Sequence, residues 1–91
     1  MTFTITKQHL ALAIKAQHKD KCQYCPVAQA VKDIIPGFTG VGTDQVRTVQ
    51  EERNWLLGDT ARGIVRWFDE GDLDELAEYL PKSVIITQCA A

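Results

Sequence analysis

Long apolar runs are missing from this sequence, and their absence excludes proteins that cross a membrane as a helix. No hydrophobic stretch approaches the roughly 20 residues that a transmembrane helix needs. The first six residues have neither the basic segment nor the apolar core of a secretory signal. These absences predict a protein of the cytoplasm that has no membrane partner.

Cysteine is scarce, and its number is odd. The chain has three cysteines, Cys22, Cys25 and Cys89. Small secreted domains that are held together by disulfides usually carry more cysteines, in even numbers. In a reducing compartment such a set indicates thiols or metal ligands.

Catalytic motifs are missing as well. The sequence has no suggestion of a Ser–His–acid arrangement. Gly40 and Gly42 lack the further glycine and the Lys–Ser/Thr pair of a phosphate-binding loop, so they are interpreted as turn residues. We therefore expect a protein that is not an enzyme.

The composition that remains is that of an ordinary folded domain. The 91 residues are 45% hydrophobic and 24% charged, which is typical of soluble globular chains. A chain of this length can bury one modest core, so residues 1–91 are expected to form a single domain.

Charge is nearly balanced in total but unevenly placed. The formal net charge is −2, yet residues 1–32 sum to +4 and the rest to −6. Half of the twelve acids lie between positions 69 and 78, with no basic residue among them. Such asymmetry steers association with charged partners, although an acidic run is also typical of a solvated helix face. The candidate partner-binding residues are Lys15, Lys19, Lys21, Asp69, Glu70, Asp72, Asp74, Glu75 and Glu78.

The first third of the chain predicts a strand and two helices. Polar and apolar residues alternate over Thr2–Thr6, and Thr6 can then cap a helix over Lys7–His18 that buries Leu10 and Ile14. A second helix starts at Pro26 with Cys25 as its cap, and Pro36-Gly37 ends it. Its expected core stripe is Val27, Ala30, Val31 and Ile34.

The remainder predicts short strands, two more helices and a final strand. Two or three antiparallel strands, with a turn at Glu51-Glu52, precede a helix that Asp59 or Thr60 caps and Gly71 ends. The expected core stripe of that helix is Ala61, Ile64, Val65 and Phe68. A fourth helix follows.

The fourth helix begins at Asp72, and Glu75 completes a capping-box pattern. Pro81 ends it. The apolar run Val84-Ile85-Ile86 predicts a buried strand that pairs with the N-terminal one. The predicted class is therefore α+β, with three to four helices packed on a small, mainly antiparallel sheet.

The Cys22-Gln23-Tyr24-Cys25 segment allows three interpretations. Two thiols at this spacing can chelate one metal ion, and His18 with His9 or Cys89 would complete a tetrahedral zinc site. A helix N-terminus also favours a thiolate, which suits a redox pair. Alternatively, both thiols pack between two helices without a ligand.

Two single-residue features have simpler interpretations. His9, in the first turn of a helix, is expected to pack or hydrogen-bond locally rather than bind a ligand. Trp55 and Trp67 could mark an interface, because tryptophan is enriched at binding hot spots, but packing at the core boundary is favoured.

Three short motifs occur along the chain: Ile5-Thr6-x-x-His9, Cys22-x-x-Cys25-Pro26-Val27-Ala28-x-Ala30-Val31-Lys32 and Phe68-Asp69-x-Gly71. They resemble the skeleton of small phage and prophage proteins of mostly unassigned function. The resemblance implies a protein that acts by binding, and anti-CRISPR and other anti-defence inhibitors are a prominent class of such proteins. This chain departs from the pattern after Gly71, where an acidic helix over Asp72–Leu80 precedes the last strand.

The leading functional hypothesis is therefore a phage-type protein that inhibits a host defence complex through charged contacts. Its partner would be a protein, a nucleic acid or a ribonucleoprotein. Two alternatives from other classes stay open: a small zinc-stabilised module that binds nucleic acid or regulates, and a thiol redox protein that uses Cys22 and Cys25.

Overall fold

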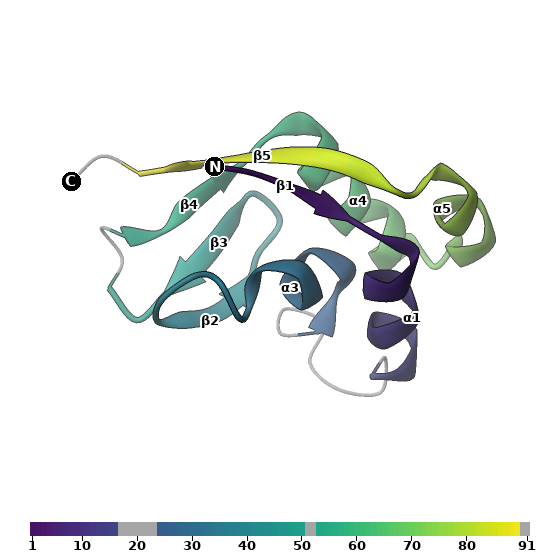
Figure 1. Ribbon diagram of the computed structural model, residues 1–91, viewed down its shortest axis with the longest axis horizontal. Coiled ribbons are helices and arrows are strands. Elements are labelled where there is room, and N and C mark those ends of the chain that lie inside the picture. The colour runs from purple at the N-terminus through teal and green to yellow at the C-terminus, as the bar shows by residue number, and fades with distance from the viewer. Residues whose placement is uncertain (17–23, 51–52, 90–91) are drawn as a thin grey trace.

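Five strands form one antiparallel sheet in the order β1-β5-β4-β3-β2, and α3 and α4 pack against one of its faces (Figure 1). The computed structural model describes residues 1–16, 24–50 and 53–89. Within them the elements are β1 (Thr2–Ile5), α1 (Lys7–Lys15), α3 (Pro26–Val31), β2 (Phe38–Val41), β3 (Gln45–Thr48), β4 (Trp55–Leu57), α4 (Asp59–Glu70), α5 (Leu73–Tyr79) and β5 (Lys82–Gln88).

The predicted α+β class is confirmed, and so is the pairing of the terminal strands. Phe3 lies opposite Val84, and Ile5 lies opposite Lys82, in an antiparallel β1–β5 ladder. Because α1 follows β1 directly and α5 precedes β5, this register brings the start of α1 and the end of α5 to the same end of the sheet (Figure 1).

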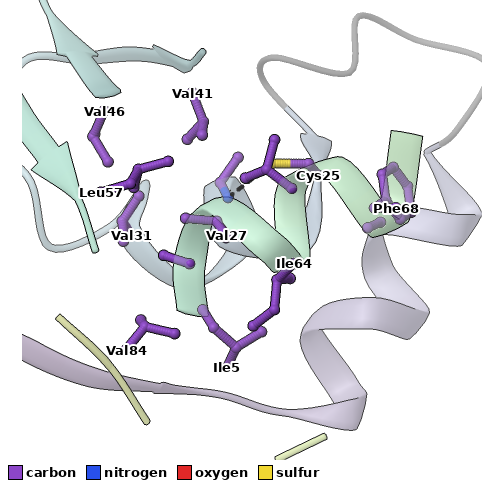
Figure 2. Packing of buried hydrophobic residues seen from close by; sticks show 14 of the residues in the cluster. Ile5, Cys25, Val27, Val31, Val41, Val46, Leu57, Ile64, Phe68 and Val84 are labelled. Carbon is purple, nitrogen blue, oxygen red and sulfur yellow. Dashed lines mark hydrogen bonds between the residues drawn. The ribbon is translucent and has the colours of Figure 1, made fainter. Parts of the chain in front are cut away.

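The core lies between the inner face of the sheet and helices α3 and α4. The four predicted core positions of α4 are all buried, and two of them, Ile64 and Phe68, are labelled in the buried cluster of Figure 2. Full burial of one aliphatic or aromatic side chain contributes about 1.5–3 kcal/mol. The buried residues drawn and labelled in the same cluster are Ile5, Cys25, Val27, Val31, Val41, Val46, Leu57 and Val84.

Two predicted core positions are wrong by one residue. Ala13, not Ile14, is buried next to Leu10 on α1, since the face of this helix toward α3 follows the i, i+3 spacing. Ile35, not Ile34, is buried after α3, because the helix ends at Val31 and the chain beyond it no longer keeps the helical phase. The two isoleucines that were expected inside are 36% and 50% exposed.

The last strand is covered on one face only. Val84 and Ile86 are buried, but Ile85 between them is 59% exposed, so the expectation of a fully buried strand is wrong. Ile85 lies on the outer face of the sheet, where its neighbour opposite on β1 is Thr2, also exposed.

The caps of α4 and α5 also differ from expectation. Gly58, rather than Asp59 or Thr60, is the N-cap of α4, and its N–H donates to the carbonyl of Ile85 at 2.8 Å. Asp72 is the N-cap of α5 as predicted, but its side chain makes no capping bond, so no capping box forms. The predicted turn at Glu51-Glu52 lies outside the described residues. Helix α1 ends earlier than the predicted His18, at Lys15 with Ala16 as its C-cap.

His9 completes the cap of α1. The Thr6 hydroxyl accepts the N–H of His9 at 3.2 Å, and Nδ1 of His9 accepts the N–H of Thr6 at 3.0 Å. The imidazole thus takes the place that Glu or Gln holds in a capping box. This confirms the expectation of a local role for His9.

The cap makes α1 sensitive to acid. An Nδ1 that accepts a hydrogen bond cannot be protonated, and burial lowers the pKa of His9 below its ordinary value of 6.5. A basic group whose pKa is lower in the folded state than in the unfolded state contributes its full stabilisation of the fold at any pH above the unfolded-state pKa. This contribution is lost as the pH falls from that value through the folded-state pKa. Unfolding by urea at pH 7.5 and pH 5 should therefore show a loss of up to about 1 kcal/mol at the lower pH.

The matched variant for this measurement is His9→Gln, which keeps an acceptor at the same helix position without titrating in this range. All other titratable groups are the same in both proteins, so their contributions cancel in the comparison. An equal pH dependence of the two proteins would contradict the capping role of the neutral imidazole.

Candidate interaction surface

The six clustered acids lie where α4 ends and α5 begins. Asp69 and Glu70 form the last turn of α4, and Gly71 follows in the left-handed conformation with φ of 88°. Asp72 is the N-cap of α5, which carries the remaining three acids. All six side chains are exposed, and we call them together the acidic surface: Asp69, Glu70, Asp72, Asp74, Glu75 and Glu78.

The inner side of α5 holds these carboxylates on a fixed scaffold. Leu76 and Leu80 are buried in the core. On the border of the acidic surface, the rings of Trp67 and Tyr79 lie 5.3 Å apart at 47°, and Nζ of Lys82 lies 4.7 Å from the centre of the Tyr79 ring. These contacts tie α5 to both α4 and β5. Trp67 is half-buried, so its packing at the core boundary is confirmed.

The acidic surface is electrostatically unfavourable for the folded chain. The charge of Asp72, and a hydrogen bond with its side chain, raise the pKa of Glu75, and Glu78 adds to this effect. Asp69 and Glu70 also lie at the C-terminal end of α4, where the helix dipole disfavours anions. Functional sites are among the places where proteins keep such locally unfavourable charges.

Few cations offset these charges in the described part of the chain. There, the one salt bridge joins Arg62 to Asp59, at the opposite end of α4 from the acidic surface. None of the six carboxylates is held in a salt bridge with a described residue, so all six can contact a cationic partner.

A cleft of about 460 Å³ borders the acidic surface along α4. Its walls carry both signs of charge, with Arg62 and Arg66 one turn apart and Asp69 shared with the acidic surface. Thr43, from the connection between β2 and β3, forms the other side. Sequence patterns did not indicate this cleft, since Thr43 is far from α4 in the chain.

The basic candidates are only partly described. Lys15 is exposed in the last turn of α1, where a cation is favourable for the helix dipole. Lys19 and Lys21 lie outside the described residues, so the basic surface predicted from the sequence stays a prediction.

Of the candidate metal ligands, Cys25 and Cys89 lie among the described residues. Cys25 is the N-cap of α3 as predicted, and its Sγ accepts the N–H of Ala28 at 3.4 Å inside the core. Cys89 is half-buried just after β5, and its N–H donates to the carbonyl of Asn54. Residues 1–16, 24–50 and 53–89 contain no group of three side chains arranged to hold a metal ion. His18 and Cys22 lie outside these residues, so the zinc and redox hypotheses stay untested.

Among the described helices, none is long and apolar enough to cross a membrane. Comparisons with protein-family models, with curated proteins and with solved structures found no match to this chain. The function of the acidic surface must therefore be argued from the chemistry of this chain.

Proposed function

We propose that this chain is a non-enzymatic inhibitor of a host defence complex and that it binds a basic, nucleic-acid-contacting surface of that complex. The observation that carries the proposal is the acidic surface, whose six exposed carboxylates are held on the α4–α5 scaffold. The resemblance of the three sequence motifs to small phage proteins supports the same class of function.

Carboxylates on a rigid scaffold suit a partner that normally binds phosphates. Proteins that hold nucleic acid neutralise phosphates with lysine and arginine side chains. A surface that offers several carboxylates competes for the same cations, and it does so without ordering a flexible segment on binding. The anchoring of α5 by Leu76 and Leu80 provides this preorganisation.

The acidic surface is favoured as the contact region for two reasons. Its six exposed members lie together where α4 ends and α5 begins. The mutual repulsion that raises the pKa of Glu75 would also be relieved by a cationic partner, because opposite charge stabilises the ionised carboxylates.

An interference assay tests the proposal. The protein would be produced in bacterial strains that each carry one nucleic-acid-guided defence system, and the plating efficiency of a targeted phage would be measured. We expect plating to be restored in at least one strain. In vitro, the purified complex should bind the protein less tightly at about 500 mM salt than at about 50 mM salt, because salt screens exposed charges.

Competition with nucleic acid provides the sharper readout. A defence complex already loaded with its target nucleic acid should no longer bind the protein, since both ligands use the same basic groove. Binding that is unchanged by loading and by salt would contradict the proposal, as would a failure to restore plating in every strain.

A further inference from the structure

Among the described strands, β1 has a neighbour on one side only, and its other edge presents main-chain groups that are ready to pair. The Met1 amino group donates to the carbonyl of Ile86, and the Ile86 N–H donates to the carbonyl of Met1. In an antiparallel ladder such mutually bonded pairs alternate with pairs that do not bond. The N–H and C=O groups of Thr2 and Thr4 therefore point away from β5. The carbonyl of Ile85, opposite Thr2, bonds on its other side to Gly58, which agrees with this pattern.

This edge lacks the features that usually prevent strand pairing. Exposed edges are commonly protected by charged residues, proline or a β-bulge. The other edge strand, β2, has a register irregularity between Phe38 and Gly40 and follows directly on Pro36 and Gly37. In contrast, β1 consists of threonine, phenylalanine and isoleucine, which favour strands, and has no bulge in its register with β5.

The sequence of β1 is also self-complementary. Around Phe3 it is the same in both directions, with Thr2 and Thr4 on either side and the apolar Met1 and Ile5 beyond them. Two copies in antiparallel orientation would thus match like with like. The sequence of the other edge strand, β2, has no such symmetry.

We infer that the β1 edge binds a second copy of this chain and forms a two-fold symmetric dimer with a continuous sheet. Thr2 of one copy pairs with Thr4 of the other and exchanges both N–H···O bonds, while Phe3 meets its symmetry mate across the axis. Cross-strand threonine pairs and aromatic pairs both stabilise antiparallel ladders. The half-buried Phe3 side chain lies on the inner face, and the exposed threonine side chains lie on the outer face.

The interface consists of one short strand from each copy, so the dimer is weak. Interfaces of small area are at the low end of affinity. Sedimentation equilibrium should show a mass approaching twice 10.2 kDa at about 100 µM and above, with dissociation on dilution. A monomeric mass throughout this range would overturn the inference.

Thr4→Pro removes one outward N–H without removing any bond to β5. Proline is tolerated on an edge strand when the missing N–H faces solvent. We expect this variant to keep its far-UV spectrum and to be monomeric at concentrations where the wild type is dimeric. In hydrogen exchange of the wild type, the amides of Thr2 and Thr4 should become protected as concentration rises, whereas constant protection would overturn the inference.

Charge substitutions test the register. The double variant T2K/T4K places lysine opposite lysine in both symmetric pairs and should weaken the dimer by about tenfold or more, because like charges directly opposite are destabilising. The double variant T2K/T4E places lysine opposite glutamate and should restore dimerisation. S83K/T87K adds the same charges to the same face of the sheet one strand inward, and serves as the control.

The oligomeric states of these variants together show what binds the β1 edge. Dimerisation of T2K/T4E but not of T2K/T4K supports the antiparallel dimer centred on Phe3. A dimer that none of the β1 variants affects forms through another surface, and that result overturns the inference.

Discussion

Under the proposed function, replacing all six carboxylates of the acidic surface with the matching amides is expected to weaken inhibition of the defence complex strongly and to leave the fold intact. Exposed ion pairs contribute about 0.2–1 kcal/mol each, so the loss of six weakens affinity by about tenfold or more. Among the described residues none of the six acids forms a salt bridge. Amides at positions 69 and 70 also relieve the unfavourable interaction with the C-terminal end of α4.

The chain supplies a matched control for this variant. Its other six acids lie at positions 20, 33, 44, 51, 52 and 59, and converting them to amides changes the net charge by the same amount. Inhibition should survive in the control and weaken strongly in the acidic-surface variant. Equal inhibition by both variants would show that total charge, and not this surface, drives binding. The melting temperature of each variant should be measured to verify folding.

Local signals in the sequence predicted several helix ends, although α3 ends at Val31 and not at the predicted Pro36-Gly37. Thr6 and Cys25 are N-caps, Pro26 begins α3, and Gly71 ends α4 in the left-handed conformation. Each of these roles depends on the residue's own backbone preference or on a hydrogen bond within one helical turn. The core stripe of α4 was also predicted correctly, because its four apolar residues lie on one face of the helix and the helix buries that face.

Features that depend on neighbours distant in the chain could not be predicted in this way. An apolar run such as Val84-Ile85-Ile86 does not reveal that its sheet has helices on only one face. The cleft beside α4 requires Thr43, which the fold brings close. The cap of α4 is a glycine because the backbone of β5 passes next to it, and no pattern in residues 58–60 indicates this.

For the candidate site, too, one prediction from the sequence is confirmed and another is wrong. The acidic surface was predicted from charge clustering, and all six side chains are exposed as a solvated helix face requires. The capping box of Asp72 and Glu75 was predicted from spacing alone and is wrong. A capping box needs the N-cap side chain to accept a backbone N–H of the first turn, and the Asp72 side chain makes no such bond. The Asp72 side chain instead interacts with Glu75, whose pKa it raises.

The close approach of β5 to Gly58 leads to the largest expected effect on stability. A Cβ atom at position 58 would lie 2.8 Å from the carbonyl oxygen of Ile85, which is main chain and cannot rotate away. The same oxygen accepts the N–H of Gly58. Gly58→Ala must therefore separate β4 from the middle of β5 or displace the first turn of α4. Steric strain of this kind costs about 1–3 kcal/mol.

Gly63→Ala is the matched control, because it makes the same chemical change on the same helix. A Cβ atom at position 63 meets nothing within 4 Å. Within α4, alanine in place of glycine should stabilise the protein by about 0.5–1 kcal/mol, since the unfolded chain loses conformational freedom. Urea unfolding should thus give changes of opposite sign for the two variants. Since Gly58 has an ordinary φ of −71°, a destabilised Gly58→Ala reports the contact with β5 and not backbone strain. A neutral Gly58→Ala would mean that β5 moves aside at little cost.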